Sequence, residues 1–306
     1  MNILHYEDII AAAAEVGFDL CGVVDAEPMP HPKEQFEQWL AEGNQGTLGY
    51  LERNVDKRFD PSLLVEGARS VIVCALAYGV PQESANSSEG RRAKIAPYAC
   101  REDYHTVFRR LLTQLAERLR LNERGIRWRA FTDSAPLAEK SLAERAGIGR
   151  RGRNSLIINS RFGSRILLGE LVVCAPADRY STPTAENPCT DCGVCVERCP
   201  AEAILSNGGI DTRRCIACRT VEPAATPSDE STAGWLFGCD ECQACCPCNK
   251  AAERRDNPLI ATLFNPHDLS ADYWAEITDK EFTERFGTTP LSRAGAERLR
   301  EGAKKL

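Results

Sequence analysis

Four cysteines between residues 189 and 199 have the spacing of an iron–sulfur motif. Cys189, Cys192, Cys195 and Cys199 form the pattern C-x2-C-x2-C-x3-C, and a proline follows the last of them. In proteins with two [4Fe–4S] clusters, the first three cysteines of such a run bind one cluster and the fourth binds the other. A structural zinc site would instead use four ligands for one ion, typically as two C-x2-C pairs. The pattern therefore favours iron–sulfur chemistry.

A second group of cysteines supplies ligands for the other cluster. Cys239, Cys242 and Cys246 form C-x2-C-x3-C, again before a proline. By symmetry with the first run, we expect Cys246 to complete the first cluster. The second cluster then has Cys199, Cys239 and Cys242, and it lacks one ligand. The spacing alone leaves three candidates for that position: Cys215, Cys218 and Cys245.

The 15 cysteines of this 306-residue chain must be interpreted together with the compartment in which it works. The N-terminal segment carries acidic side chains where a secretory signal would carry lysine or arginine. No apolar run approaches the roughly 20 residues that a membrane helix needs. We therefore expect a cytoplasmic protein, in which so many cysteines indicate metal or redox chemistry rather than disulfides. Cys21, Cys74 and Cys174 lie in apolar segments and are expected to be core residues.

The net charge of −6 is distributed unevenly along the chain. Residues 1–60 hold 12 acidic side chains against 4 basic ones, whereas residues 109–165 hold 14 Lys and Arg against 5 acidic side chains. A solvated helix face would explain the basic segment, and so would a polyanionic substrate. Charge alone does not decide between these two explanations.

Apolar periodicity predicts alternating helices and strands in the segment before the first cysteine run. The predicted helices cover residues 6–19, 33–43, 104–122 and 137–149. The predicted strands cover residues 21–26, 70–78, 126–133, 155–159 and 165–175, with a turn at 160–164. This part contains no G-x-G-x-x-G and no P-loop motif, which argues against an ordinary nucleotide-binding fold.

A linker rich in Pro, Ser and Thr near residue 181 separates this part from most of the cysteines. Eleven of the 15 cysteines lie beyond the linker, from Cys189 to Cys248, and short helical segments follow after about residue 256. We predict an α+β chain with three parts: residues 1–180, residues 181–255 with the two clusters, and a helical tail at 256–306.

Six segments of the chain resemble the epoxyqueuosine reductase family, in the same order and over nearly the whole length. They include "DSAPLAEKSLAERAGIG" and "GCDECQACCP" and lie at residues 39–61, 103–112, 131–159, 163–173, 238–247 and 282–293. The resemblance implies an N-terminal α/β reductase-type domain that binds base-off cobalamin, then a bacterial ferredoxin-like domain with two [4Fe–4S] clusters. It also implies that the helical tail packs back on the body, and that the chain is a short form without the helical repeats of many members.

The implied reaction is the last step of queuosine biosynthesis, in which epoxyqueuosine at the wobble position of tRNA is reduced to queuosine. The clusters would pass electrons from a low-potential donor of the flavodoxin or ferredoxin type, giving cob(I)alamin from cob(II)alamin in a monomeric enzyme. Two alternatives are another corrinoid iron–sulfur reductase, similar to reductive dehalogenases, and a ferredoxin-type electron carrier. Dehalogenases usually carry a twin-arginine export signal, and the N-terminal segment of this sequence shows none. An electron carrier would not need so long a segment before its clusters.

The resemblance also assigns the cluster ligands. It places a ligand in the "RRCIAC" segment at Cys215. The first cluster is then bound by Cys189, Cys192, Cys195 and Cys246, and the second by Cys199, Cys215, Cys239 and Cys242. Cys245 becomes a spare thiol, and the role of Cys218 stays open.

Asp133 of the "DSAP" motif corresponds to the proton donor of the family. An epoxide oxygen is a poor leaving group unless it is protonated, so the reaction needs such an acid. Its position at the end of a predicted strand also suggests a buried carboxyl with a raised pKa, or an N-cap for the helix at 137. His105 and Tyr104 of "DYH" are the next candidates for the acid.

The resemblance implies cobalamin contacts at Arg58, Asp133, Ile157 and Leu168. Without the resemblance, Arg58 would be taken for a surface charge. The chain departs from the family pattern at Cys100, Arg101, Arg150 and Cys248, all in segments expected around the cofactor and substrate pocket. We also predict that three arginines beside this pocket contact tRNA phosphates: Arg150, Arg151 and Arg153.

Overall fold

The computed structural model describes residues 3–83, 91–190, 192–222 and 231–306. Its helices are α1 (Tyr6–Val16), α2 (Pro30–Ala41), α3 (Val55–Phe59), α4 (Tyr104–Arg118), α5 (Glu139–Arg145), α6 (Val194–Glu197), α7 (Ile216–Val221), α8 (Glu241–Ala244), α9 (Pro247–Ala251), α10 (Ala271–Glu276), α11 (Asp279–Phe286) and α12 (Gly295–Lys304). Its strands are β1 (Leu20–Asp25), β2 (Ser70–Ala77), β3 (Lys94–Ile95), β4 (Trp128–Phe131), β5 (Arg150–Arg151), β6 (Ile157–Ile158), β7 (Ile166–Val173) and β8 (Trp235–Phe237). No helix in these ranges is long and apolar enough to cross a lipid bilayer.

The largest sheet has four strands in the order β1-β2-β7-β4, and all three pairings are antiparallel. Every residue of β2 is buried, as expected for an apolar strand in the middle of a sheet that is covered on both faces. The α+β class agrees with the prediction. The alternation of helices and strands does not, however, produce the parallel sheet typical of α/β folds, because neighbouring strands of this sheet run in opposite directions.

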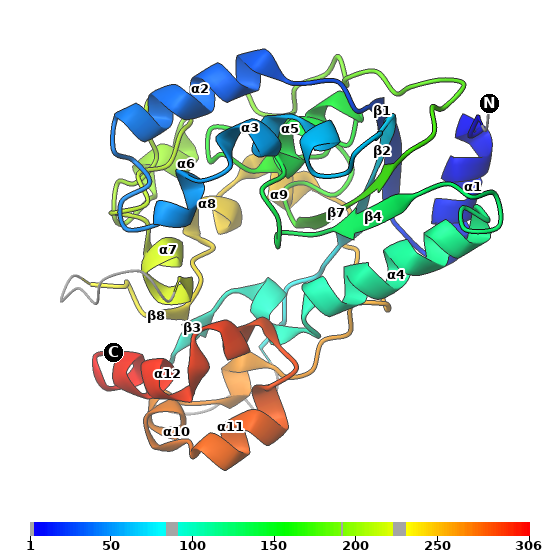
Figure 1. Ribbon diagram of the computed structural model, residues 1–306. Helices are drawn as coiled ribbons and strands as arrows, with labels where there is room; N and C mark the ends of the chain where they lie inside the picture. The colour runs from blue at the N-terminus through cyan, green and yellow to red at the C-terminus, as the bar shows by residue number, and fades with distance from the viewer. Residues whose placement is uncertain (1–2, 84–90, 191, 223–230) are drawn as a thin grey trace.

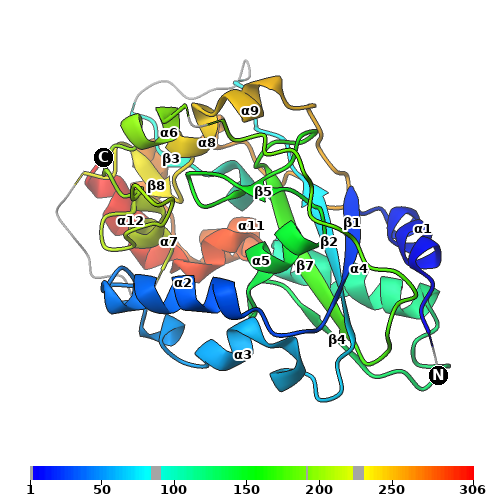
Figure 2. The same cartoon turned by 90° about the horizontal axis from the view of Figure 1, so that it is seen from above.

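Helices cover both faces of this sheet (Figures 1 and 2). On one face, α1 and α4 contribute residues such as Ile9, Phe108 and Leu112 to a buried cluster with the sheet. A Cβ atom at Gly169 of β7 would meet Cδ1 of Phe108 at 2.2 Å, so α4 packs directly against the backbone of this strand. On the other face, α3 and α5 pack against the sheet in a second buried cluster, which includes Leu142 of α5.

The predicted helices begin close to their expected residues and end earlier. Helix α1 ends at Gly17, whose φ of +103° is a left-handed conformation that glycine adopts without strain. Helix α4 begins after Asp103, whose side chain accepts a hydrogen bond from the backbone N–H of His105. It ends at Arg118 rather than near 122, because Arg120 takes a positive φ of +52°.

The strands predicted at 155–159 and 165–175 both exist but belong to different sheets. Strand β6 pairs with β5, whereas β7 joins the four-stranded sheet. Between them, Gly163 has a φ of +65°, and a Cβ atom there would lie 2.1 Å from Oδ1 of Asn249. This close approach brings the turn against the cysteine-rich segment.

The tail from residue 256 packs with a segment that lies far away in the sequence. Trp274 and Phe286 are fully buried, with ring centroids 4.8 Å apart, and their cluster includes Ile95, Cys100 and Phe237. Figure 1 shows these C-terminal helices below the sheet, beside β3 and β8. Strand β3 pairs in parallel with β8, so residues 94–95 connect to the cysteine-rich part. The domain boundaries at 180 and 255 stay a prediction.

Candidate active site and iron–sulfur centres

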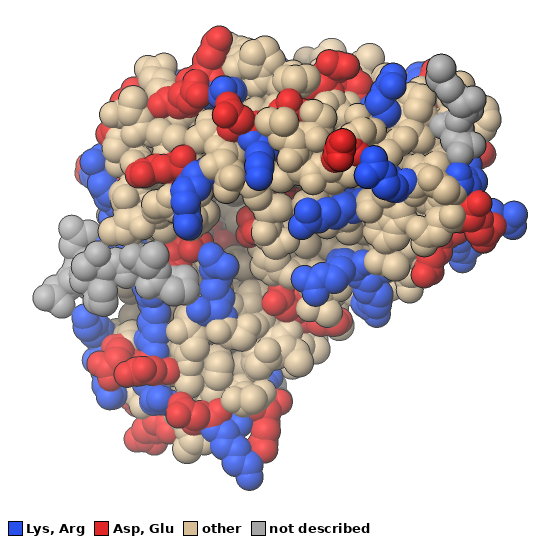
Figure 3. Space-filling view, viewed as in Figure 1, with Lys and Arg blue, Asp and Glu red and all other residues tan. Residues whose placement is uncertain are grey.

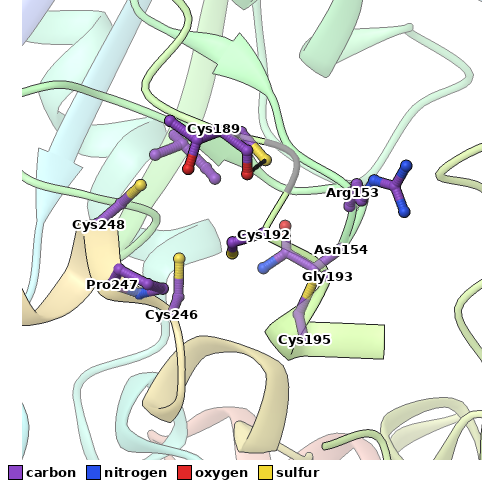
Figure 4. A pocket seen from close by; sticks show the side chains of 11 residues that line it. Arg153, Asn154, Cys189, Cys192, Gly193, Cys195, Cys246, Pro247 and Cys248 are labelled. Atoms are coloured by element: carbon purple, nitrogen blue, oxygen red, sulfur yellow. Dashed lines mark hydrogen bonds between the residues drawn. The ribbon is translucent and has the colours of Figure 1, made fainter. Parts of the chain in front are cut away.

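The four cysteines predicted for the first cluster line one cavity (Figure 4). Cys195 lies on α6, and Cys246 is the N-cap of α9. Gly193, with a φ of +71°, turns the chain between the loop of Cys192 and helix α6. The cavity is also lined by Cys248, Arg153, Asn154 and Ile158.

Four thiols around one cavity are a suitable donor set for a [4Fe–4S] cluster, which takes one thiolate at each iron. In the described part of the chain, no three His, Cys, Asp or Glu side chains converge tightly enough to hold a single metal ion. A cube needs a wider arrangement, because its four iron atoms lie at separate corners. The residues present therefore fit the cluster predicted for this site.

The four cysteines predicted for the second cluster are coupled electrostatically through Cys215, the N-cap of α7. Burial raises the pKa of the Cys215 thiol, and the charge of Cys199 adds to the effect. Burial, with a contribution from Cys215, raises the pKa of Cys239 to about 12. Burial also raises the pKa of Cys242, with contributions from Asp240, Cys239 and Cys215. The structure thus brings these thiols together.

The other two candidates for the missing ligand, Cys218 and Cys245, have different neighbours. Cys218 follows Cys215 on α7, and burial together with the charge of Cys215 raises its pKa to about 11. Cys245 lies on the side of the first group, because its charge contributes, after burial, to the raised pKa of Cys195. Cys215 contributes to the raised pKa of Cys239 and Cys242 and is itself affected by Cys199. Its assignment as the missing ligand stays a prediction.

Asp133 lies in the loop between β4 and α5, and its side chain is 66% exposed. The expected burial of this carboxyl is therefore wrong: a φ of +46° at Asp133 turns the chain out of the strand. The N-cap interpretation is also wrong, because α5 begins after Ala138 without a side-chain cap. Oδ2 of Asp133 accepts a hydrogen bond from Tyr104 at 2.7 Å and lies 3.9 Å from Nε2 of His105.

The loop around Asp133 is fixed at both ends by backbone carbonyls. The hydroxyl of Thr132 donates to the carbonyl of Leu168 at 2.9 Å, and the N–H of Ala138 donates to the carbonyl of Arg58 at 2.8 Å. Two of the predicted cobalamin contacts, Arg58 and Leu168, thus lie next to the Asp133 loop. Another predicted contact, Ile157, is 4% exposed and packs in the core beneath α5.

Charged and phenolic groups from several elements surround Asp133. Burial raises the pKa of Tyr50 to about 12, with contributions from Glu222 and Asp133. Burial also lowers the pKa of Arg58, whose guanidinium lies over the ring of Phe36 at 5.3 Å. Nε of Arg58 is buried and has no hydrogen-bond partner among the described residues.

His105 is the second titratable group beside Asp133. Burial would lower its pKa, but the hydrogen bond and charge of Asp103 and the charge of Asp133 outweigh burial and raise it. Its Nδ1 lies 2.7 Å from Oδ1 of Asp103. The imidazole is therefore held by Asp103 and stacks on Tyr104 with ring centroids 4.1 Å apart.

The residues that depart from the family pattern have different surroundings. Cys100 and Arg101 are buried, and the Arg101 guanidinium donates to Asp256 and to the carbonyls of Ile260 and Gly79. Neither residue lines the cavity of the first cluster. Cys248, by contrast, lines the cavity of the first cluster. Arg150 lies on β5, beside the predicted tRNA contact Arg151.

Two acidic residues near Asp133 were not singled out from the sequence. Glu139 accepts a hydrogen bond from the backbone N–H of Asp133 at 2.5 Å, and Glu170 is fully buried in β7. A signal for Glu170 was present, because it is the one charged residue in the strand sequence "ILLGELVV".

Two family models match separate parts of this chain. Residues 58–134 match the family model described as epoxyqueuosine reductase QueG, DUF1730, and residues 188–249 match the 4Fe-4S double cluster binding domain. An epoxyqueuosine reductase of Cyclobacterium marinum is 37% identical over 294 residues, which cover 94% of this chain and 92% of the relative.

Solved structures of epoxyqueuosine reductases have a fold similar to that of this chain. An epoxyqueuosine reductase crystallised with an epoxyqueuosine-modified tRNA stem loop has a TM-score of 0.86 and 28% identity, covering 98% of this chain and 80% of that one. The Bacillus subtilis epoxyqueuosine reductase, with a catalytic loop that is named for an aspartate swung out of the active site, has a TM-score of 0.83, 27% identity and the same coverage. This chain therefore carries a 4Fe–4S double cluster domain, belongs to the epoxyqueuosine reductase family and is an oxidoreductase that reduces epoxyqueuosine.

Proposed function

We propose that the protein reduces epoxyqueuosine to queuosine at the wobble position of tRNA, with cobalamin as the reductant and two [4Fe–4S] clusters as its electron supply. The observation that carries this proposal is the placement of Asp133. Its exposed carboxylate projects from a loop fixed by Arg58 and Leu168, within hydrogen-bond distance of Tyr104. An acid in such a position can reach a bound substrate.

The thiols assigned to the clusters support the electron supply. Cys189, Cys192, Cys195 and Cys246 would hold the first cluster in the cavity of Figure 4. The second cluster would be held by four thiols, which have to be thiolates to bind iron: Cys199, Cys215, Cys239 and Cys242. Burial raises the pKa of Cys215, Cys239 and Cys242 in the metal-free chain, so cluster binding has to release their protons.

Arg58, Leu168 and Ile157 are the proposed contacts for cobalamin. The buried Nε of Arg58, which has no hydrogen-bond partner in the described part of the chain, fits a cofactor whose corrin ring carries amide side chains that can accept a hydrogen bond. Bound in its reduced form, cobalamin would supply the low-potential electrons that cleave the carbon–oxygen bonds of the epoxide. Leu168 would contribute its half-buried side chain beside the Asp133 loop.

Asp133 is proposed to deliver one of the two protons with which the epoxide oxygen leaves as water, and the other would come from solvent. Tyr104 donates to Oδ2, which leaves Oδ1 to carry the proton toward the substrate. Burial and the charge of Asp133 raise the pKa of Tyr104, so its hydroxyl stays protonated and keeps this orientation. His105 stays bound to Asp103 and supports the Tyr104 ring by stacking.

A tRNA substrate requires a surface for phosphates next to the site. Figure 3 shows a hollow between the upper part of the molecule and the C-terminal helices, and Lys and Arg side chains gather beside it over α4 and β4. Arg150, Arg151 and Arg153 lie on or just after β5 and are the proposed phosphate contacts. Each contact would release counterions and make the affinity salt-dependent. The electron donor of flavodoxin or ferredoxin type is likewise a proposal, as is the monomeric state.

The test is turnover of the proposed substrate. Anaerobically purified protein, loaded with iron, sulfide and cobalamin, is incubated with a chemical reductant and tRNA that carries epoxyqueuosine. Nucleosides from the digested tRNA are then analysed by mass spectrometry. We expect conversion to queuosine, with the loss of one oxygen atom, and no conversion when cobalamin is omitted. Unchanged epoxyqueuosine with a fully loaded enzyme would contradict the proposal.

A further inference from the structure

Glu170 is a carboxyl side chain in the interior of the sheet. It is 0% exposed and lies opposite Val73 of β2 and Phe131 of β4. Along β7 its side chain lies on the same face as Val172, which packs beneath α5. Neither of its oxygens accepts a hydrogen bond from an N–H or hydroxyl group of the described residues. An ionised carboxylate in this position, without a donor, would be strongly destabilising.

The polar neighbour of Glu170 is the carboxyl of Glu139. Burial raises the pKa of Glu170 well above its ordinary value, and the charge and hydrogen bond of Glu139 raise it further. Two carboxyl groups can form a hydrogen bond with each other when one of them carries a proton. Burial and the charge of Asp133 raise the pKa of Glu139 as well.

Glu139 connects this buried group to the proposed acid. Its Oε1 accepts the backbone N–H of Asp133 at 2.5 Å. That N–H belongs to a residue with a φ of +46°, a conformation that a non-glycine residue adopts at a cost. The hydrogen bond to Glu139 is therefore one of the interactions that keep the Asp133 loop in place.

Other titratable and charged groups face the pair from each element packed around it. They are Asp133 on the loop, Lys140 on α5, Arg58 on α3, Tyr104 on α4 and Cys74 on β2. Within the described ranges none of these groups donates a hydrogen bond to Glu170, which leaves the neighbouring carboxyl of Glu139 as the group that can pair with it.

We propose that Glu139 and Glu170 share one proton, with the proton on Glu170 and the negative charge on Glu139, and that this pair positions the Asp133 loop. The protonated Glu170 donates to one oxygen of Glu139, and the other oxygen accepts the N–H of Asp133. Asp133 keeps the role of acid, and the pair acts through it. The catalytic part of this inference rests on the proposed function; the protonation state does not.

Infrared spectroscopy tests the shared proton without any turnover. A protonated carboxyl has a C=O stretch that shifts in heavy water, and we expect the wild type at neutral pH to show such a band. Glu170→Gln should remove the band, because Glu170 carries the proton. Glu139→Gln should keep it at a shifted frequency, because the neighbour of Glu170 is then an amide and not a carboxylate. Val172→Ala, a control on the same face of β7, should leave the band unchanged. Identical carboxyl spectra in the wild type and Glu170→Gln would overturn the shared proton.

Turnover then tests the positioning role. Glu139→Ala removes the acceptor for the Asp133 N–H, and we expect kcat to fall by about ten- to a hundredfold, the range for a hydrogen bond to a charged group. Glu139→Gln keeps an oxygen acceptor for this N–H, so its kcat should recover most of what Glu139→Ala loses. The melting temperatures of the two variants are compared to detect a difference in folding. Equal losses in both variants, or no loss in either, would contradict the positioning role. If the wild type did not reduce epoxyqueuosine, the proposed function would be refuted. The infrared result would still decide whether Glu139 and Glu170 share a proton.

Discussion

The hydroxyl of Tyr104 donates a hydrogen bond to Oδ2 of Asp133 at 2.7 Å and so connects the first turn of α4 to the loop after β4. Tyr104→Phe removes this bond and keeps the ring that stacks on His105. A hydrogen bond to a charged group contributes about 1.5–3 kcal/mol, and the exposure of Asp133 places this one at the lower end. We expect kcat to fall about tenfold, measured on tRNA carrying epoxyqueuosine.

Three further measurements show whether Tyr104→Phe changes only the interaction with Asp133. Iron content, cobalamin binding and melting temperature should equal those of the wild type. A wild-type kcat in Tyr104→Phe would show that the hydroxyl does not orient Asp133.

The two-cluster assignment predicts about eight iron and eight sulfide ions per chain after anaerobic reconstitution. Cys215→Ala should reduce both numbers to about half, because the second cluster loses a ligand. Cys245→Ala is the matched control: it removes a nearby thiol that has no assigned ligand role, and should keep the full content. Full iron content in Cys215→Ala, or half content in Cys245→Ala, would contradict the assignment.

Asn249 connects the cysteine-rich part to the turn before β7. It is 7% exposed, its Nδ2 donates to Oγ of Ser164 and to the carbonyl of Gln243, and its Oδ1 accepts the N–H of Ser164. Asn249→Ala leaves the buried N–H of Ser164 without its acceptor, at about 1–3 kcal/mol for an unsatisfied group. The hydroxyl of Ser164 and the carbonyl of Gln243 each keep another hydrogen bond. We expect a lower free energy of unfolding, measured by denaturant titration, and a weaker hold on the first cluster, because Asn249 lies on the same helix that Cys246 caps.

Asn249→Asp gives a control that retains the acceptor oxygen for Ser164 and changes the donor. If the contact with Ser164 dominates, Asn249→Asp should lose less stability than Asn249→Ala. If Asn249→Ala were as stable as the wild type, this connection would not contribute to the fold.

The basic residues after α5 give a prediction about tRNA affinity. Replacing Arg150, Arg151 and Arg153 by Ala should weaken tRNA binding and flatten its salt dependence, by a slope of roughly 0.9 for each duplex phosphate contact and less for single strands. A control triple with the same loss of charge lies toward α1: Arg118, Arg124 and Arg179. Affinity and slope should change less in the control than in the β5 triple, as measured by fluorescence anisotropy at several salt concentrations. Equal effects would show a general charge effect rather than specific contacts.

The sequence was a good guide where the relevant spacing is local. The C-x2-C-x2-C run curls a short segment of chain, and the structure places its three thiols with Cys246 around one cavity. Helical periodicity located α1 and α4, because their apolar faces repeat within one element. The missing ligand stayed open on spacing alone, because Cys215 is separated from the other thiols along the chain.

Features that depend on distant contacts were not predictable in the same way. The antiparallel order β1-β2-β7-β4 joins strands from separate segments of the chain, and a fully buried strand such as β2 has no alternating pattern that marks its neighbours. The exposure of Asp133 depends on one left-handed residue, for which the sequence offers no glycine as a signal. The pairing of Glu139 with Glu170 requires α5 to lie on β7, which only the tertiary packing determines.

The central claim is that Asp133 is the proton donor, and Asp133→Asn tests it most directly. The Asn side chain has nearly the same volume and can still accept the hydrogen bond of Tyr104, so folding, iron content and cobalamin binding should stay close to those of the wild type. General acid catalysis contributes about 10²–10⁴-fold. Turnover of epoxyqueuosine in tRNA should fall by that factor, while reduction of cobalt, followed in the visible spectrum, persists. Turnover near the wild-type rate would contradict the account and move the acid to His105, Tyr104 or a bound water, and loss of cobalamin would make Asp133 a cofactor-positioning residue instead.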